Sequence, residues 1–259
     1  MSSIIQSLWV GSKLSVIEQL ALASFVAHGH EFHLYTYNLV DGVPEGVVQR
    51  DAAEVMPESS IFVTHDGSYA LFSDWFRWKL LLERGGYWVD TDVVCLKPFD
   101  FGDEMVFGRE SDRVVNTAVL SVPRGHELAE LMLSSAISPF KTQVCDDSKT
   151  RRRKIRCRLL GKGYQSAKWG DVAGPRAFTR ALRHFGLFEK AKPHLAFYPV
   201  HPMNWDAIFD ETYSSGMGAF ESSYAIHLWN EMARRAIGFD KNAHFPEKSL
   251  IERLKATYL

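Results

Sequence analysis

The sequence is short of the features that mark secreted, disulfide-rich and nucleic-acid-binding proteins. Only three of its 259 residues are cysteines, Cys95, Cys145 and Cys157, and their scattered positions form no CxxC pair. We therefore expect reduced thiols in a cytosolic protein, not a disulfide framework or a zinc site. The formal net charge of −1 provides no general basic excess, which argues against binding to nucleic acid.

Two further absences concern membranes and phosphate-binding loops. The first six residues show no charged segment followed by a long apolar run, so no signal peptide is expected. No apolar run reaches the roughly eighteen residues of a spanning helix, so we expect a cytoplasmic chain, at most peripheral to the inner face of the plasma membrane. The turn at 11–13 contains neither GxGxxG nor GK[ST], which excludes the usual dinucleotide and P-loop sites.

What is present indicates a single α/β domain over residues 1–259. The 46% hydrophobic content suffices for a sizeable core. A strand at 4–10, a helix at 15–28 and a strand at 32–37 predict a parallel pair with a right-handed crossover. Ser15 and Glu18 have the spacing of a capping box at the start of that helix. The later expected strands are 47–53, 87–89, 93–99, 105–109 and 114–122, and the later expected helices include 125–137, one from Pro175, and 247–258.

The stretch 73–92 is the most informative part of the sequence. It begins as a helix whose apolar residues cover most faces, which predicts burial. The helix should end at Gly85 and Gly86, because a left-handed cap strains any other residue. Asp74 and Arg77 lie three residues apart on one face of this helix. Burying either charge is costly unless it finds a partner.

A pair of carboxylates follows the helix. The aromatic strand 87–89 leads to Asp90 and Asp92, and an extended segment would project both side chains to the same side. Neighbouring carboxylates repel unless a cation lies beside them, and hard oxygen ligands suit Mg²⁺ or Mn²⁺. Taken alone, an Asp-x-Asp pair is equally consistent with a solvated acidic turn, so its context decides the interpretation.

That context resembles the DXD-containing sugar-nucleotide glycosyltransferases: Ser-Asp-x-x-Arg on a buried helix, Gly-Gly, an aromatic strand, then Asp-x-Asp. The similarity is greatest to the family of bacterial capsule and lipopolysaccharide hexosyltransferases, yeast initiating mannosyltransferases and vertebrate α-1,4-galactosyltransferases. Large clostridial glucosylating toxins share its core. The resemblance implies a GT-A-like α/β fold, with a mixed, mostly parallel central sheet flanked by helices and a site at the strand ends.

The resemblance also implies roles for individual residues. Asp92 and His227 would hold the cation on the donor diphosphate, and Asp90 would bind ribose or the metal. Asp74 and Arg77 would act at the reaction centre by holding the hexose hydroxyls. The other donor-binding residues that it implies are Trp9, Asn38, Trp88, Asn116, Gly174, Trp229 and Asn230.

Several of these positions have a second interpretation. Trp9 either stacks on the uracil or packs in the core. Asn116 either approaches the donor sugar or is a turn residue. Asp171 is a candidate catalytic residue beside a Gly-Pro helix start, and it could contact either the donor hexose or the acceptor. His227 is either a cation ligand or a structural histidine.

The function expected from the resemblance is metal-dependent, retaining transfer of a hexose from a nucleotide sugar. The donor is expected to be a UDP-hexose, and the acceptor a hydroxyl of a glycan or glycolipid such as a polysaccharide or lipopolysaccharide. The cofactor is expected to be Mn²⁺ or Mg²⁺. Two alternatives from other classes are a nucleotide-sugar hydrolase and a catalytically silent module that binds nucleotide sugars.

A dense basic run lies outside this motif. Seven of the ten residues at 149–158 are Lys or Arg. We expect a loop or insertion at about 139–170 that is either a solvated surface or a contact for anionic lipid or an anionic acceptor. Aromatic residues are sparse in the run, which argues against stacking on nucleic acid bases.

Overall fold

The computed structural model describes residues 4–65, 67–168 and 170–259, which form two compact units. The first unit contains residues 4–51, 89–102 and 193–259, and the second contains the described residues of 52–88 and 103–192. Each unit is therefore assembled from segments that are far apart in the sequence. The assignment of residues 1–259 to a single domain stays a prediction.

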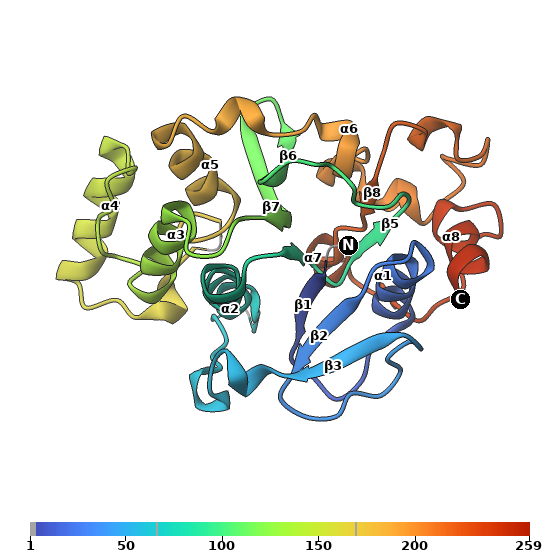
Figure 1. The fold of residues 1–259 in the computed structure, drawn as a ribbon, viewed down its shortest axis with the longest axis horizontal. Coiled ribbons are helices and arrows are strands. Elements are labelled where there is room, and N and C mark those ends of the chain that lie inside the picture. The colour runs from blue at the N-terminus through green and yellow to red at the C-terminus, as the bar shows by residue number, and fades with distance from the viewer. Residues whose placement is uncertain (1–3, 66, 169) are drawn as a thin grey trace. The chain divides into compact units, whose positions relative to one another are not determined.

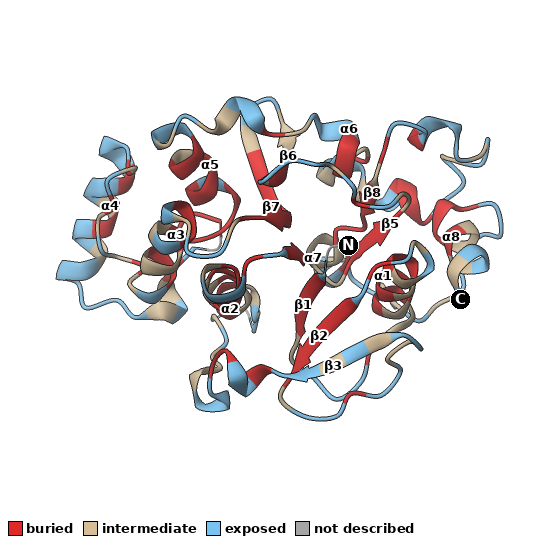
Figure 2. Cartoon of the chain, in the orientation of Figure 1, coloured by how far each residue is buried: buried red, intermediate tan, exposed pale blue. Residues whose placement is uncertain are grey.

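The first unit opens with the expected crossover. Strand β1 (Ile5–Trp9) pairs in parallel with β2 (Phe32–Thr36), and helix α1 (Val16–Ala27) connects them. Strand β3 (Val47–Asp51) pairs in parallel with β2 on its other side, as Figure 1 shows. All five residues of β2 are buried, whereas β3 is largely exposed, as expected of an edge strand (Figure 2).

The start of α1 follows the predicted capping pattern. The Ser15 backbone N–H donates to the Glu18 carboxylate at 3.0 Å, which satisfies a donor that the helix leaves without a partner. Further along the helix, Ile17, Leu20 and Phe25 are fully buried, so α1 contributes one whole face to the core of this unit.

The rest of the first unit is organised around a short antiparallel pair. Strand β5 (Val93–Cys95) pairs with β8 (Ala225–His227), and Val93 lies opposite His227. The predicted strand 93–99 is thus shorter than expected. The helices of this unit that follow Lys192 in the chain are α6 (His194–Phe197), α7 (Asn230–Arg235) and α8 (Leu250–Tyr258).

The second unit contains the buried helix predicted around Asp74. Helix α2 (Ala70–Arg84) packs against α3 (Glu127–Ile137), and α5 (Pro175–His184) packs on β7 (Val114–Ser121). Its strands run in the order β4 (Tyr87–Val89, of which Tyr87 and Trp88 belong to this unit), β7 and β6 (Val106–Ser111), with β6 and β7 antiparallel.

The basic run is a helix, not the loop that was expected. Helix α4 (Ser148–Leu159) is capped by Asp147, whose carboxylate accepts a hydrogen bond from the Thr150 N–H at 2.7 Å. Lys and Arg are good helix formers, and a capped start with inward-facing ion partners stabilises the helical form. The surface position expected for the run is confirmed for most of its basic side chains.

The predicted fold class is confirmed as α/β, with mixed, mostly parallel strands flanked by helices. None of the helices in the described part of the chain combines the length and the apolar character needed to cross a bilayer.

The glycine at the end of α2 generates a testable prediction. Gly85 has a φ of +68°, and a Cβ there would lie 2.9 Å from the Arg124 backbone nitrogen. We expect Gly85→Ala to lower the free energy of unfolding by about 2–4 kcal/mol, because it adds a clash with backbone to the cost of a left-handed alanine. Urea denaturation measures this loss.

Gly125→Ala is the matched control within the same unit. Its φ of +73° is similar, but a Cβ there meets nothing within 4 Å. It should cost only the conformational part, about 1–2 kcal/mol. Equal losses in the two variants would show that the approach of Arg124 to Gly85 does not matter.

Candidate functional site

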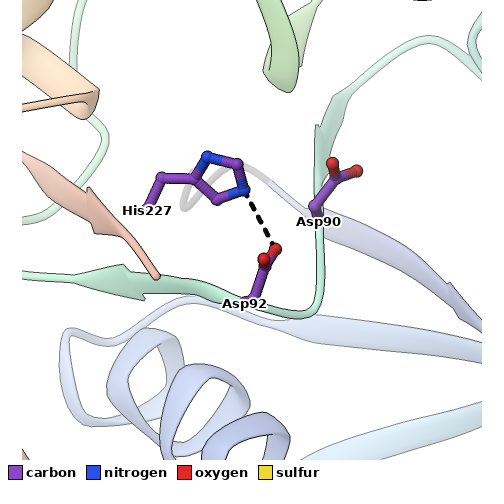
Figure 3. A group of neighbouring side chains, drawn as sticks. All are labelled: Asp90, Asp92 and His227. Carbon is purple, nitrogen blue, oxygen red and sulfur yellow. Dashed lines mark ion pairs between the residues drawn. The ribbon is translucent and has the colours of Figure 1, made fainter. Parts of the chain in front are cut away.

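Three of the predicted site residues come together in the first unit. Strand β4 ends at Val89, and the chain turns through Asp90 and Asp92 before β5 begins. Because β5 pairs with β8, His227 is brought beside Asp92. Asp90, Asp92 and His227 each offer a ligand atom, and these atoms lie within 4.8 Å of one another (Figure 3).

The reason for this proximity differs from the one expected. The segment from Asp90 to Asp92 is a turn and not an extended strand, so alternation along a strand does not align the two carboxylates. Their approach results from the turn itself, in which the Val93 N–H donates to the Asp90 carbonyl at 3.1 Å. The Leu228 N–H also donates to the Asp92 carbonyl at 2.9 Å, which ties the turn to the end of β8.

Asp92 is a buried carboxylate with several stabilising partners. His227 Nε2 lies 3.2 Å from Asp92 Oδ1, and the Asn230 backbone N–H donates to Oδ2 at 2.8 Å. Burial raises the pKa of Asp92, but attraction to His227 and Lys241, with hydrogen bonds from His227 and Asn230, outweighs it and leaves the pKa below its ordinary value. The ionised carboxylate therefore contributes stability above the ordinary pKa of about 3.9, and this is lost as pH falls through the lower folded value.

A second layer of contacts holds Asn230 in place. Its side-chain amide donates to Glu18 at 2.8 Å, and Lys241 Nζ lies 2.5 Å from the same carboxylate oxygen. Glu18 is fully buried although it carries a charge. Sequence reasoning identified Glu18 only as a capping residue and missed Lys241, because these contacts span more than two hundred residues and leave no local pattern.

Trp229 fixes the turn between β8 and Asn230. It adopts a left-handed backbone conformation with φ of 57° and ψ of 44°, which is uncommon for a residue other than glycine. Its indole Nε1 donates to the Val200 carbonyl at 2.9 Å, and its ring centroid lies 4.2 Å from that of His227. The strained turn is thus held from both sides, as is common at functional sites.

The donor set of this group fits a hard divalent cation. Two carboxylates and one imidazole are ligand types that Mn²⁺ accepts, and carboxylate oxygens suit Mg²⁺. Asp92 is 7% exposed and His227 8% exposed, while Asp90 is half-buried, so the group combines fixed ligands with access from solvent. These residues could therefore hold the expected Mn²⁺ or Mg²⁺.

A second group of predicted residues comes together within the other unit. Asp74 and Arg77 form an ion pair of 2.8 Å on α2, and both are almost completely buried. The Arg77 guanidinium lies over the Trp88 ring, 4.8 Å from its centroid. At Gly174 a Cβ would lie 3.2 Å from Asp74 Oδ2 and 2.9 Å from Gly170 Cα, so only glycine fits there.

Asp171 is held by arginines. It pairs with Arg153 of α4 and with Arg176 of α5, the latter at 2.6 Å, and its backbone carbonyl accepts from Arg180 at 2.8 Å. Burial raises the pKa of Asp171, but the hydrogen bonds and charges of Arg153 and Arg176 lower it below its ordinary value. The carboxylate thus links two helices, and its contact with a donor or acceptor stays a prediction.

The remaining predicted residues are placed as follows. Asn116 lies inside β7 and is therefore not a turn residue; its amide donates to Glu110 at 2.6 Å, and its oxygen accepts from the Ala118 N–H. Trp9 is half-buried at the end of β1. Asn38 follows β2 and is exposed.

Two segments of the chain match known families of proteins. Residues 48–112 match the family described as "Glycosyltransferase sugar-binding region containing DXD motif", and residues 157–258 match the "Alpha 1,4-glycosyltransferase conserved region". The first segment contains Asp74, Arg77, Asp90 and Asp92, and the second contains His227.

Curated relatives carry transferase names. Lactosylceramide 4-alpha-galactosyltransferase of Rattus norvegicus is 26% identical over 189 residues, covering 73% of this chain and 47% of the relative. Alpha-1,4-N-acetylglucosaminyltransferase of Homo sapiens is 24% identical over 175 residues, covering 62% of this chain and 42% of the relative. The chain thus spans about half the length of the curated relatives it matches.

The fold also has a counterpart among solved structures. The PaToxG glycosyltransferase superposes with a TM-score of 0.50 and 16% sequence identity, over 73% of this chain and 72% of that one. At this identity the likeness concerns the fold alone. The two matched regions and the named relatives show that the chain is similar to DXD-containing glycosyltransferases, and the structure brings its DXD turn beside a histidine.

Proposed function

We propose that the chain transfers a hexose from a nucleotide sugar, a UDP-hexose by the family resemblance, to a hydroxyl of a glycan or glycolipid. The observation that carries the proposal is the group of Asp90, Asp92 and His227, whose ligand atoms lie within 4.8 Å of one another. The relatives' names support a hexose donor, and that of the lactosylceramide enzyme supports a glycolipid acceptor.

The proposed cation chemistry depends on preorganised ligands. A bound Mn²⁺ or Mg²⁺ would neutralise the charge that develops on the departing diphosphate. Asp92 is already ionised and oriented by His227 and by the Asn230 N–H, so little reorganisation is needed when the donor arrives. Asp90 is more accessible and would take either the cation or the donor ribose.

Following the family resemblance, we assign the binding of the hexose hydroxyls to Asp74 and Arg77. Their ion pair and the Trp88 ring fix the Arg77 fork, and a planar fork suits adjacent hydroxyl oxygens. Gly174 leaves the approach to Asp74 free of a side chain. Retention of anomeric configuration is part of the proposal, with the leaving phosphate as base for the acceptor hydroxyl.

Removal of one cation ligand tests the proposal. Asp92→Asn keeps the size of the side chain but removes its charge. Hexosyl transfer should therefore fall by at least about 100-fold, and Mn²⁺-dependent binding of UDP should weaken with it. Transfer of radiolabelled hexose from UDP-hexoses to lactose-terminated glycolipid, with and without Mn²⁺, measures the effect.

Asp206→Asn is the control, because Asp206 is an exposed aspartate of the same unit. It should leave transfer within about twofold, as surface substitutions away from special contacts usually do. Full wild-type transfer in excess EDTA would contradict the metal dependence. Release of free hexose at the full turnover rate without acceptor would show that the chain hydrolyses the nucleotide sugar instead of transferring its hexose.

The sugar-binding assignment gives a separate prediction. Asp74→Asn should reduce transfer by about 100-fold while UDP affinity stays within about twofold, because its contacts go to the hexose and not to the nucleotide. Arg77→Lys should act in the same direction, since a point charge does not replace a planar fork. Isothermal titration with UDP and with UDP-hexose separates the two affinities.

Glu83→Gln provides the matched control on α2, because Glu83 is exposed and pairs with Lys79 on the same helix. It should change neither affinity. Circular dichroism of Asp74→Asn checks the fold, because the substitution leaves Arg77 buried without its charged partner. Equal weakening of UDP and UDP-hexose binding in a folded Asp74→Asn protein would show that Asp74 does not act at the hexose.

A further inference from the structure

Helix α4 has its polar and apolar residues in unusual places. The buried residues of this helix are Thr150 and Lys154, both polar. Its apolar side chains lie outside: Ile155 is 37% exposed and Leu159 is 80% exposed, and Leu160 directly after the helix is 61% exposed. A helix on a soluble surface normally shows the opposite arrangement, with apolar residues inward and charges outward.

Ion pairs explain the inward face. Lys154 pairs with the buried Asp146 at 2.8 Å, and Arg153 pairs with Asp171. These contacts hold α4 to its unit by its charged residues, and they leave Ile155 and Leu159 free to face outward. The apolar exposure is therefore fixed by the way the helix is attached.

The outward face combines this apolar pair with arginines. Ile155 and Leu159 are four residues apart, so they are neighbours on one helix face. Residues three or four positions from Ile155 surround the pair, and they are Arg151, Arg152 and Arg158; Arg156 lies three before Leu159. Within the described part of the chain, these four arginines are exposed and make no ion pair. They form a local positive excess in a chain of net charge −1.

We propose that this face of α4 docks on an anionic lipid bilayer. Arginines beside an apolar stripe are the pattern by which a helix lies in the membrane interface, with the apolar residues among the upper acyl chains and the cations at lipid phosphates. The occupant follows from charge complementarity together with the exposed Ile155 and Leu159. A face that only contacts water would not explain the exposure of Leu159. A nucleic acid site would need aromatic side chains that stack on bases, and α4 has none.

This inference is independent of the proposed transfer reaction. It concerns residues that lie mostly between the two matched family segments, 48–112 and 157–258, and the outward face itself contains none of the groups assigned to cation or donor. Docking by this face requires only the surface of α4, so a protein without transferase activity would still bind vesicles.

Vesicle co-sedimentation tests the proposal. The wild-type chain should bind phosphatidylcholine vesicles that contain phosphatidylglycerol, should bind pure phosphatidylcholine at least about tenfold more weakly, and should lose binding as salt rises. A variant with Arg151→Gln, Arg152→Gln, Arg156→Gln and Arg158→Gln should lose at least about tenfold in affinity for the anionic vesicles. All four side chains are exposed, so the variant should fold normally, as circular dichroism checks.

The matched control removes four exposed basic residues outside α4, namely Arg50, Arg124, Lys190 and Lys248. Replaced by Gln, they should leave vesicle affinity within about twofold, which separates docking by α4 from an effect of total charge. Ile155→Ser with Leu159→Ser tests the apolar part, and it should weaken binding at high salt more than at low salt.

Three results would overturn the proposal: no binding of the wild-type chain to anionic vesicles at low salt, equal binding by the α4 arginine variant, or equal losses in the variant and its control. Binding of the wild-type chain to single-stranded RNA but not to anionic vesicles would likewise contradict the proposal, because it would identify RNA and not lipid as the ligand.

Discussion

The buried, ionised carboxylate of Asp92 must be stabilised by fixed partners, and this requirement determines many of the contacts of the first unit. Removing a carboxylate from water is costly, and the cost must be met by partners that stay in place. His227 and the Asn230 N–H supply them, but each is brought there by a different part of the fold. The β5–β8 pair places His227, and the left-handed turn at Trp229 aims the Asn230 N–H at Asp92.

The same requirement explains contacts farther away. Asn230 is held by Glu18, whose own buried charge is met by Lys241. The start of α1 is therefore connected to the segment that follows β8, although the two are at opposite ends of the sequence. In the second unit, Asp74 with Arg77 and Asp146 with Lys154 obey the same rule, since each buried charge has an opposite charge beside it.

Local patterns predicted many elements of the fold, and the family resemblance predicted which residues form the candidate cation site. The crossover from β1 to β2, the cap at Ser15 and the buried α2 depend on residues close together in the sequence, so periodicity and capping rules suffice for them. The Asp-x-Asp pair was found because it follows a recognisable helix and glycine stop. The geometry expected for the pair was wrong, because residues 90–92 form a turn and not an extended segment.

What could not be predicted depends on long-range partners. Glu18 already has a local role as a capping residue, so nothing in the sequence indicates its second contact with Asn230. The basic run was expected to be a loop or insertion because it is dense in Lys and Arg. The buried Asp146 and Asp171, which pair with Lys154 and Arg153, show how it is attached as helix α4 and which of its faces is left outside.

The proposed cation site at Asp90, Asp92 and His227 is tested most directly by anomalous diffraction from crystals grown with Mn²⁺ and UDP. We expect a manganese peak about 2.0–2.3 Å from an Asp92 carboxylate oxygen and from a His227 ring nitrogen, with Asp90 at the cation or at the UDP ribose. At saturating Mn²⁺ and UDP, a peak bound by other residues, or bound UDP with no manganese near Asp92, would contradict it.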